Sequence, residues 1–543
     1  MKTVKRSPTG RYIVSLPKNE EILSHLGDSR KIAIRRFITT ERRLTTDKSL
    51  RDQYTSFMRE YLDLGHMQPI AETKVNTIKR CYLPHHPVIK TSSTTTKLRV
   101  VFDGSCKTST GISLNDSLLL GPVVQEDLRS IILRSRTRQV MIVSDIEKMF
   151  RQIHIASEDK PLQSIIWRFS PTDEIQTFEL NTVTYGTKPA PFLATRVLRQ
   201  LAMDEKDRFP LAARTIHEDV YMDDILTGSE TIEEAKILRI QLDEIMSSGG
   251  FQLRKWASNC PEVLENIPNR NLAIPDQNGI CLDPDPGVTT LGLVWKPKTD
   301  VFQLRFNIPM LQPTDVINKR KVLSIIAAAL YDPLGLIGAT ITTAKIFLQL
   351  LWTLLDSDGK KLDWDQPLPS SVVKEWMKYY IKLPLLAEIK IQRCVIVPRA
   401  AFIELHCFPD ASIRAYGTCI YVRSQDEQGR IYVRLLTSKS KVSPLKCQSV
   451  PRLELCGALL ATQLHKKAKE SIRRPIRSYF WTDSTCVLQW LKAIPITWTT
   501  FVANRVSKIQ ELSEGCEWQH VSGKQNPANL ISRGISPESI IDN

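Results

Sequence analysis

Two short stretches of this chain decide its fold: QVMIVSDIEKMF at residues 139–150 and HEDVYMDDILTG at residues 217–228. In the first stretch, the apolar run 140–143 has the length and composition of a buried β-strand, and Asp145 follows its end. In the second stretch, residues 221–224 lie between two arms of alternating apolar residues, which predicts a tight hairpin turn. A hairpin of this kind can hold two acidic side chains beside the end of a neighbouring strand.

These elements predict that Asp145, Asp223 and Asp224 lie close together. Three neighbouring carboxylates repel one another unless divalent cations lie between them, and oxygen ligands suit hard Mg²⁺. Two such ions can activate an attacking hydroxyl and stabilise a leaving pyrophosphate in phosphoryl transfer. Taken alone, each motif favours a simpler interpretation. Asp223 and Asp224 would be an ordinary Asp-Asp turn, and Asp145 would be an acid at a strand end. The surrounding sequence therefore decides between the two interpretations.

Six blocks surround these acids in a fixed order between about residues 60 and 300: YLPHHPVIK, KLRVVFDGSCKTSTGISLNDSLLLGP, SDIEKMFRQI, LNTVTYGTKPAPFLATR, YMDDILTG and GGFQLRKWASN. As an ordered set they resemble the reverse transcriptases in the polyproteins of Bel/Pao-type LTR retrotransposons. The resemblance implies an RNA-directed DNA polymerase. Its reaction would be two-metal nucleotidyl transfer from a dNTP to a primer 3′-hydroxyl on an RNA or DNA template.

The resemblance also implies roles for individual residues. Asp145, Asp223 and Asp224 match the metal-binding aspartates of the polymerase site. The remaining matches lie at nucleotide-binding positions: Lys97 and Arg99 for the triphosphate, Phe150 for the ribose 2′ position, Gly186 near nucleotide and template, and Lys255 for the pyrophosphate. Arginine suits bidentate phosphate contact and lysine supplies a point charge.

Without the family, these nucleotide-binding positions have simpler interpretations. Phe150 would be a core aromatic, Gly186 a turn glycine, and Lys97 and Arg99 solvated charges beside a strand. LGLVW at residues 291–295 resembles the hairpin that grips the primer end.

A second set of acids lies towards the C-terminal end. Asp410 follows the strand-like AFIELHCF, Glu454 lies early in the helical pattern RLELCGALLATQLHKKAK, and Asp483 follows the strand-like IRSYFWT. Such positions can bring three side chains to one sheet edge, although each alone is more typical of a capping or surface acid. With PDAS, PRLELCGALLA, WTDST and NPANLISRG around them, they resemble the ribonuclease H domain of the same elements. The resemblance implies that these three acids hold two Mg²⁺ ions, which activate water to cut the RNA strand of an RNA–DNA hybrid.

The last of these motifs departs from the family pattern. NPANL has Asn529 where the family usually has an aspartate. Asparagine keeps an oxygen ligand but lacks the charge, so a second metal ion would be held less well. His520 in WQHV matches a histidine that assists product release in the family, and a surface histidine is the simpler alternative. Our hypothesis is weakened ribonuclease H activity beside an intact polymerase.

The composition favours a nucleic-acid partner. Lys plus Arg is 74 and Asp plus Glu is 58 in 543 residues, a formal net charge of +16. This excess favours a polyanion, nucleic acid before an anionic membrane surface. No apolar run has membrane-spanning length, and the basic stretch HKKAKESIRRPIR is interrupted by Pro475 and poor in aromatics. Eleven cysteines without a CxxC spacing indicate reduced thiols in an intracellular protein.

These observations set the expected cofactors, partners and location. We expect Mg²⁺, with Mn²⁺ as an alternative, and as partners a template–primer of RNA or DNA, dNTPs and other retroelement polyprotein segments. No membrane is expected, and the location would be a cytoplasmic particle or the nucleus. His85 and His86 in LPHHP have no nearby metal-ligand partners in the sequence, which favours a structural loop.

A rival interpretation is a catalytically silent, domesticated element that only binds nucleic acid. Protease, zinc-knuckle and integrase motifs do not occur in this sequence, which predicts one segment of a polyprotein or a remnant. Those missing motifs and Asn529 favour the rival, whereas the intact Asp145 and YMDD oppose it.

The expected fold class is an α+β multidomain protein. A right-hand polymerase of fingers, palm and thumb would be followed by an α/β ribonuclease H-like domain. Within this fold, residues 40–61 predict helix, residues 323–341 predict two buried helices joined by a turn, and IQRCVIV predicts a strand from Ile391. Residues from about 398 to 535 predict the element order β-β-β-α-β-α, followed by a polar tail segment. The predicted boundaries are an N-terminal extension at 1–60, fingers and palm at 61–310, a helical thumb and connection at 311–397, the ribonuclease H-like domain at 398–535 and a tail at 536–543.

Overall fold

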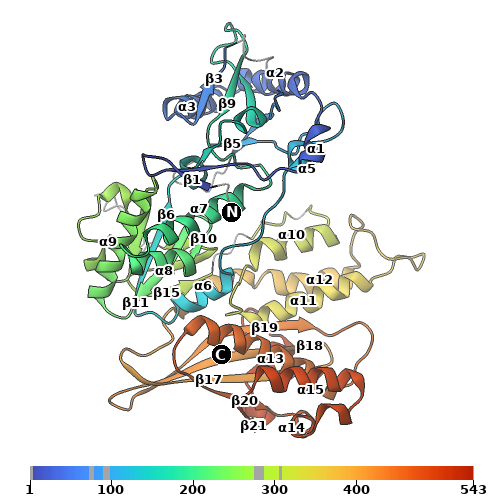
Figure 1. Cartoon of the computed structure of the whole chain (residues 1–543). Helices are drawn as coiled ribbons and strands as arrows, with labels where there is room; N and C mark the ends of the chain where they lie inside the picture. The colour runs from blue at the N-terminus through green and yellow to red at the C-terminus, as the bar shows by residue number, and fades with distance from the viewer. Residues whose placement is uncertain are drawn as a thin grey trace. The chain divides into compact units, whose positions relative to one another are not determined.

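The computed structural model describes residues 4–71, 79–89, 98–273, 287–304, 308–312 and 314–541. Contacts divide the chain into two compact units (Figure 1). The first unit comprises Met1–Glu126, Asp145–Ile225 and Leu238–Arg254, and the second comprises Asp127–Ser144, Leu226–Ile237 and Lys255–Asn543. Within the described ranges, no helix is both long and apolar enough to cross a bilayer.

The first unit begins with strands and helices that precede the predicted palm. These are β1 (Val4–Arg6), β2 (Tyr12–Val14), α1 (Glu20–Ser24), α2 (Arg30–Thr46) and α3 (Lys48–Asp63). The helical pattern expected over residues 40–61 is divided between α2 and α3 at Asp47. Asp47 has an extended backbone, and its side chain accepts the backbone N–H of Leu50, so it caps the start of α3.

Short strands complete the part of the first unit around these helices. β1, β2 and β7 (His154–Ile155) form one sheet, and β4 (His85–Ile89) pairs with β5 (Leu98–Phe102) in another. The third sheet has the order β3-β9-β8, with bounds Met67–Pro69, Gln176–Leu180 and Ser164–Trp167.

An aromatic core joins these elements. Trp167 is buried, and its ring centroid lies 5.6 Å from that of Phe37 on α2 and 5.4 Å from that of Tyr54 on α3. His85 is buried in the same core, with its Nδ1 hydrogen-bonded to the Tyr54 hydroxyl and its Nε2 2.9 Å from the carbonyl oxygen of Ile166. Burial lowers the pKa of His85 to about 4. The structural role expected for His85 is confirmed, but the histidine lies on a strand rather than in a loop.

The palm sheet contains the strand and hairpin that the sequence predicts. Its order is β10-β11-β6-β12, with bounds Val220–Tyr221, Asp224–Ser229, Val140–Ile146 and Leu253–Ser258. Helices in the same part of the chain are α5 (Leu114–Ser117), α7 (Ala190–Glu205), α8 (Pro210–Glu218) and α9 (Ile232–Ser248). β6 is buried along almost its whole length, as an apolar run in a central strand requires.

The second unit contains a four-stranded sheet of order β13-β14-β15-β16. Its strands are Val288–Thr290, Leu293–Lys296, Val301–Gln303 and Lys390–Gln392. LGLVW forms the expected hairpin, because Leu291 and Gly292 both have positive φ between β13 and β14. The helices around it are α6 (Leu128–Ser135), α10 (Lys319–Ala329), α11 (Gly338–Thr353) and α12 (Ser370–Tyr380). α10 and α11 confirm the two helices expected around the turn at residues 332–335.

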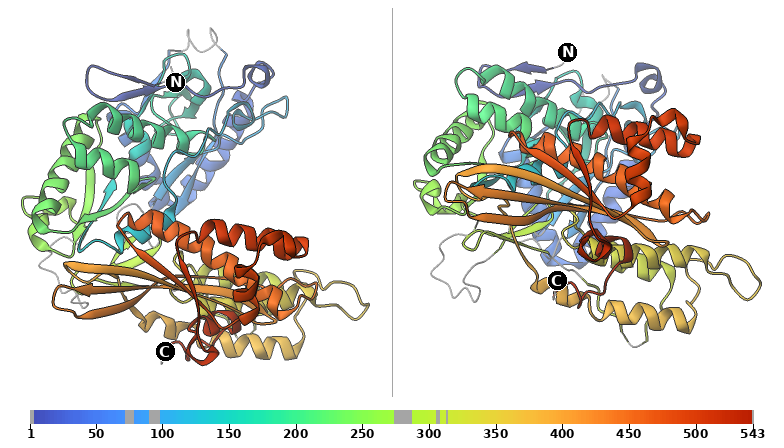
Figure 2. Two further views of the ribbon diagram at one scale, coloured as in Figure 1. Left: turned by 60° about the horizontal axis from the view of Figure 1, so that its bottom comes forward. Right: turned by 90° about the horizontal axis from the view of Figure 1, so that it is seen from below.

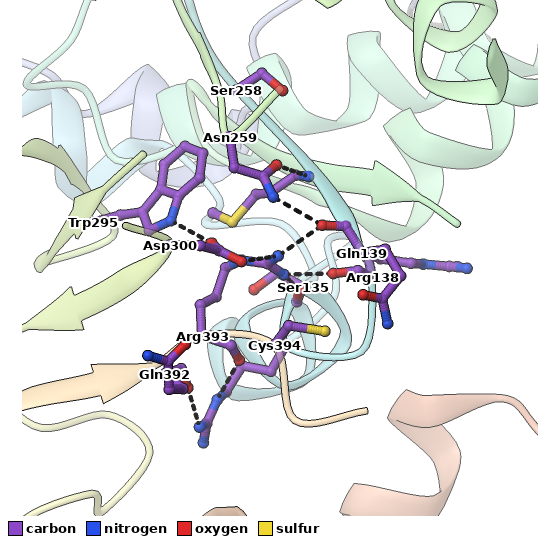
Figure 3. A network of polar contacts seen from close by, with 12 residues as sticks. Ser135, Arg138, Gln139, Ser258, Asn259, Trp295, Asp300, Gln392, Arg393 and Cys394 are labelled. Carbon is purple, nitrogen blue, oxygen red and sulfur yellow. Dashed lines mark hydrogen bonds and ion pairs between the residues drawn. The ribbon is translucent and has the colours of Figure 1, made fainter. Parts of the chain in front are cut away.

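A network of buried polar contacts lies beside β16 (Figure 3). The fully buried Arg393 donates to both carboxylate oxygens of Asp300, at 2.6 and 2.7 Å. It also donates to the backbone carbonyls of Ser135, Arg138 and Gln139. The strand expected from Ile391 onward in IQRCVIV therefore ends early, at Gln392, where the Arg393 side chain turns into this network.

A second buried arginine, Arg136, extends the network, and no carboxylate pairs with it among the residues that the structure describes. Its guanidinium donates to the backbone carbonyls of Gln392, Arg393, Leu435 and Leu436. Burial lowers the pKa of Arg136 to about 9. Carbonyl dipoles thus satisfy the N–H groups of a charge that has been taken out of water.

The C-terminal part of the second unit has a five-stranded sheet of order β19-β18-β17-β20-β21. The long antiparallel strands β17 (Ala400–Ala411), β18 (Ala415–Asp426) and β19 (Ile431–Val442) lie side by side in Figure 2. β20 (Arg477–Thr482) is parallel to β17, and β21 (Glu517–His520) is parallel to β20. The predicted β-β-β-α-β-α order is confirmed.

Helices cover this sheet. They are α13 (Val450–Ile472), α14 (Thr485–Lys492), α15 (Thr500–Leu512) and α16 (Ala528–Arg533). α13, α14 and α15 share one apolar core that includes Leu455, Val487 and Val506. α16 and α11 share another core with β18, through Ile531, Ala339 and Cys419.

Candidate active sites

The palm hairpin lies directly beside the end of β6. The backbone N–H of Ile146 donates to the carbonyl oxygen of Asp223 at 2.8 Å, and Tyr221 pairs with Asp224 across the turn. Met222, in the turn, has a φ of 57°, a conformation that costs energy for a residue with a side chain. Asp145 precedes Ile146 in the chain, so this bond joins the strand end that carries Asp145 to the hairpin that carries Asp223 and Asp224.

A cation from the neighbouring strand β12 pairs with Asp145. The Arg254 guanidinium donates from Nε to Asp145 Oδ1 at 2.9 Å and from Nη1 to Glu147 at 3.4 Å. Asp223 is exposed and Asp224 is half-buried. The sequence does not predict the pairing, because residues 145 and 254 are far apart in the chain. The only available signal is the position of Arg254 beside Lys255 in LRKW.

The predicted nucleotide-binding residues lie on several elements. Arg99 is exposed on β5, and Phe150 is half-buried in the short 3-10 helix η1 (Met149–Gln152), which follows β6. Lys255 lies on β12 with a φ of 54°. Lys97 lies outside the described residues.

Gly186 occupies a position that excludes a side chain. Its φ is 103°, and a Cβ atom there would lie 2.0 Å from the carbonyl oxygen of Phe102, at the end of β5. Asn115 holds the same loop, because its amide donates to the Gly186 carbonyl at 3.0 Å and its Oδ1 accepts the Lys188 N–H at 2.7 Å. The close approach explains glycine at this position better than turn geometry alone.

The second set of acids converges at one edge of the C-terminal sheet. Asp410 lies at the end of β17, Glu454 in the first turns of α13 and Asp483 just after β20. One potential ligand atom of each lies within 4.8 Å of the others. Among the described residues, no other set of three acidic, cysteine or histidine side chains has ligand atoms this close together. The three palm acids therefore lie farther apart than this spacing.

Crowding and burial change the acidity of these groups. Burial, with the nearby charges of Asp410 and Asp483, raises the pKa of Glu454 to about 8. Burial also raises the pKa of Asp410 to about 6, against the opposing hydrogen bond from Ser532. Glu454 Oε2 and Asp483 Oδ1 are buried and have no hydrogen-bond partner in the part of the chain that the structure describes. Two unpartnered oxygens among three close carboxylates fit a divalent cation.

Two residues near this cluster position the acids. The Ser532 hydroxyl on α16 donates to Asp410 Oδ2. Gly457 allows α13 to approach β17, since a Cβ atom there would lie 3.1 Å from the carbonyl oxygen of Asp410. No sequence pattern marked Ser532 as a partner of Asp410, although Ser532 lies in NPANLISRG and one helical turn after Asn529, on the same face of the helix.

Asn529 and His520 lie on segments that border the cluster. The Asn529 amide donates to the carbonyl oxygen of Gly523, in the short helix η7 (Gly523–Gln525). A Cβ atom on Gly523 would lie 3.1 Å from Asp483 Oδ2, so this segment lies against the cluster. His520 is exposed at the end of β21, where it pairs with Thr482.

Two family models match the chain. Residues 88–256 match the reverse transcriptase (RNA-dependent DNA polymerase) family, and residues 318–484 match the Pao retrotransposon-like RNaseH-like domain. Among curated proteins, none matches the sequence.

Solved structures of foamy viral protease-reverse transcriptases share the fold. The form titled dRH in complex with double-stranded DNA is 16% identical, with a TM-score of 0.51 over 86% of this chain and 68% of that one. The complex with RNA/DNA hybrid is 13% identical, with a TM-score of 0.53 over 88% of this chain and 54% of that one. A further protease-reverse transcriptase structure in complex with double-stranded DNA, not titled dRH, is 14% identical, with a TM-score of 0.51 over 87% of this chain and 83% of that one. This chain thus spans about half of the hybrid-bound relative.

The fold and the family matches define the chain as a reverse transcriptase followed by a ribonuclease H-like domain. The match over residues 318–484 is to the Pao type, which is the type that the resemblance to Bel/Pao elements predicts. The predicted fold class is confirmed, and the predicted domain boundaries and site residues stay predictions.

Proposed function

We propose that the palm site extends a primer 3′-hydroxyl with deoxynucleotides on an RNA or DNA template. The observation that carries the proposal is the 2.8 Å hydrogen bond from Ile146 to Asp223, because it joins the strand of Asp145 to the hairpin of Asp223 and Asp224. A strand end joined to a tight hairpin by a backbone hydrogen bond supports the proposal, because such elements suit the positioning of reacting groups.

Asp145, Asp223 and Asp224 would hold the divalent cations, with Mg²⁺ favoured by the all-oxygen donor set. When bound, these ions supply the activation of the attacking hydroxyl and the stabilisation of the leaving pyrophosphate. The remaining roles belong to the chain itself. Arg99 and Lys97 would bind the triphosphate, Phe150 would exclude a ribose 2′-hydroxyl, Gly186 would leave room for nucleotide and template, and Lys255 would face the pyrophosphate. The β13–β14 hairpin would contact the primer end.

Primer extension on poly(rA)–oligo(dT) with Mg²⁺ tests this proposal. We expect products from the native chain and none from Asp223→Asn, because one metal-binding charge is lost while the shape is kept. Asp207→Asn is the matched control, since Asp207 is an exposed acid between α7 and α8. An inactive but well-folded native chain would instead support the rival, a silent element that only binds nucleic acid.

A second activity is cleavage of the RNA strand of an RNA–DNA hybrid. It is favoured by the spacing of Asp410, Glu454 and Asp483 within 4.8 Å and by their unpartnered oxygens. The Asn529 amide would weaken the hold on a second ion, and His520 would assist product release. Cleavage of a hybrid labelled on the RNA strand by Asp223→Asn protein tests it, since that variant removes the polymerase reaction alone. No cleavage by this variant at any metal concentration would contradict the proposal.

A further inference from the structure

A cavity of about 460 Å³ lies within the second unit, away from both sets of acids. It is lined by the start of α11, by β16, β18, β19 and α16, and by the segment that follows α16. Much of the wall is aliphatic, through Leu336, Ile337, Ala339, Ile389, Leu530 and Ile531. A cavity of this size with an apolar wall is typical of a small-molecule site, since protein interiors are otherwise closely packed.

The lining also contains three cations and no acid. The cations are Arg136, Lys390 and Arg434. None of them pairs with a carboxylate in the part of the chain that the structure describes. The Arg434 guanidinium lies 5.7 Å from the ring centroid of Tyr432, a contact that leaves its charge in place. Charge complementarity therefore favours an anionic group on the ligand.

Arg136 is the cation that is most in need of a counter-charge, because its side chain is only 1% exposed. Its guanidinium has five N–H groups, and four of them donate to backbone carbonyls at 2.6 to 3.0 Å. The described residues leave one N–H of Nη2 without an acceptor. A ligand carboxylate would accept this N–H and supply a full negative charge, which carbonyl dipoles do not.

The acids in the same region are engaged elsewhere. Asp300 accepts both of its hydrogen bonds from Arg393, which does not line the cavity. Asp332 also lies outside the lining, and its Oδ2 accepts the backbone N–H of Ile337 at 2.8 Å. Burial raises the pKa of Asp332, which disfavours its charged form. Neither acid therefore takes the place of an anion in the cavity.

We propose that this cavity binds a small amphipathic carboxylate. Its carboxylate group would contact Arg136 and Arg434, and its alkyl body would pack against the aliphatic wall. The phosphate backbone of a nucleic acid would gain nothing from that wall, so the ligand class differs from the template and primer. The proposal does not depend on the proposed polymerase or ribonuclease activity.

The wall of the cavity continues into the C-terminal acid cluster. Leu530 and Ile531 of α16 line the cavity, and the next residue, Ser532, donates to Asp410. A ligand packed against Leu530 and Ile531 would stabilise α16 in this position. We therefore expect the backbone amides of α16 to exchange more slowly with solvent when the cavity is occupied.

Isothermal titration calorimetry on the full chain tests the proposal with decanoate as the probe. We expect saturable binding at one site, with affinity rising about two- to fourfold for each methylene from hexanoate to decanoate. Decanamide has the same body without the charge and should bind at least about tenfold more weakly, because a charge-assisted hydrogen bond is lost. Decylamine, a cation at neutral pH, should not bind measurably.

Two neighbouring residues give a matched pair of variants for the cavity. Ile540 lines it, whereas Ile541 is 44% exposed and does not. Ile540→Trp should place a larger side chain in the cavity and weaken decanoate binding at least about tenfold, since part of the apolar volume is filled. Ile541→Trp should bind decanoate as the native chain does. Hydrogen exchange should show protection of α16 by decanoate in the native chain and in Ile541→Trp only.

A second pair of variants addresses charge. Arg136 is left unchanged, because its side chain satisfies four buried carbonyls. Arg434→Gln should weaken decanoate about threefold and leave decanamide unchanged, as expected for a partly solvated ion pair. Lys441→Gln removes an exposed charge from the same strand outside the lining and should change neither affinity.

Three results would overturn the proposal. The first is a native chain that binds decanoate no more tightly than decanamide, which would show that the cations do not select an anion. The second is unchanged decanoate affinity in both Ile540→Trp and Arg434→Gln, which would place the ligand elsewhere. The third is the absence of saturable binding by a well-folded native chain. Primer extension and hybrid cleavage are measured separately, so failure of either activity does not affect these readouts.

Discussion

The palm and the C-terminal sheet each gather three acids, but they do so in different ways. In the palm, Asp223 is exposed and Asp145 is paired with Arg254 at 2.9 Å. In the C-terminal sheet, Asp410, Glu454 and Asp483 lie within 4.8 Å of one another, and two of their oxygens have no described partner. Repulsion is therefore offset by a neighbouring cation at the first site and by retained protons at the second, where the pKa of Glu454 rises to about 8.

This difference indicates how each site would respond to metal. At the palm, a cation bound to Asp145 would compete with Arg254. At the C-terminal sheet, the acids are held by Ser532 and by the packing of α13, and a cation must displace protons. The two activities should therefore be separable by mutation and should differ in how pH affects metal binding.

The largest expected effect is on the polymerase. Asp145→Asn should lower primer extension about a thousandfold, because removing one metal-binding charge is worth several kcal/mol of transition-state stabilisation. Hybrid cleavage by the same protein should change by less than about twofold. Steady-state extension and cleavage assays on one preparation measure both, and a parallel loss of cleavage would contradict separate sites.

The converse variant is Glu454→Gln. We expect hybrid cleavage to fall at least about a hundredfold, since the charge that completes the cluster is lost. Primer extension should be unchanged. Glutamine keeps the size of the side chain and removes a carboxyl that folding forces to hold a proton, so amide hydrogen exchange in α13 should not become faster. Faster exchange would mean that the loss reflects unfolding rather than chemistry.

Metal binding to the C-terminal cluster should depend on pH. The raised pKa values of Glu454 and Asp410, about 8 and about 6, mean that the folded chain holds protons that the unfolded chain releases. Without metal, stability should therefore fall as pH rises from about 4, the ordinary range of a carboxyl pKa, to about 8. Mn²⁺ affinity should rise on the order of tenfold or more over the same range, with proton release. Calorimetry in two buffers measures this, and Glu454→Gln is the control. A pH-independent affinity in the native chain would contradict the account.

The smallest expected effect comes from Asn529→Asp. An added carboxylate should strengthen the hold on a second ion, but aspartate cannot donate to the Gly523 carbonyl as the asparagine amide does. The lost hydrogen bond costs about 1 kcal/mol, so we expect cleavage to rise by less than about tenfold. Hybrid cleavage at saturating Mg²⁺ tests this, and equal rates would show that Asn529 does not weaken the site.

Local patterns in the sequence predicted the elements on which both sets of acids lie. The apolar run before Asp145 became β6, and the turn at 221–224 became the hairpin, because strand and turn preferences act over a few residues. Strand-end and helix-start positions likewise predicted that Asp410, Glu454 and Asp483 would converge. These features depend on neighbours within a few residues and on standard sheet geometry.

The sequence did not predict contacts between distant segments. Arg254 with Asp145, Ser532 with Asp410, and Arg393 with Asp300 join residues about 90 to 120 positions apart, and no local pattern marks either partner. The early end of the strand at Gln392 also depends on a distant contact. The buried ion pair of Arg393 with Asp300 ends the strand, although the residues that follow are β-rich. Asp47 divides one expected helix into two. The sequence did not predict this division, because a single capping side chain is easily overlooked within a helical pattern.

One assay tests the central claim most directly. An end-labelled RNA template annealed to a labelled DNA primer, incubated with the native chain, Mg²⁺ and dNTPs, reports both activities in the same reaction. We expect a longer primer and a shortened template, with Asp223→Asn removing only the first and Glu454→Gln only the second. A well-folded native chain that leaves the primer at its original length would contradict the account.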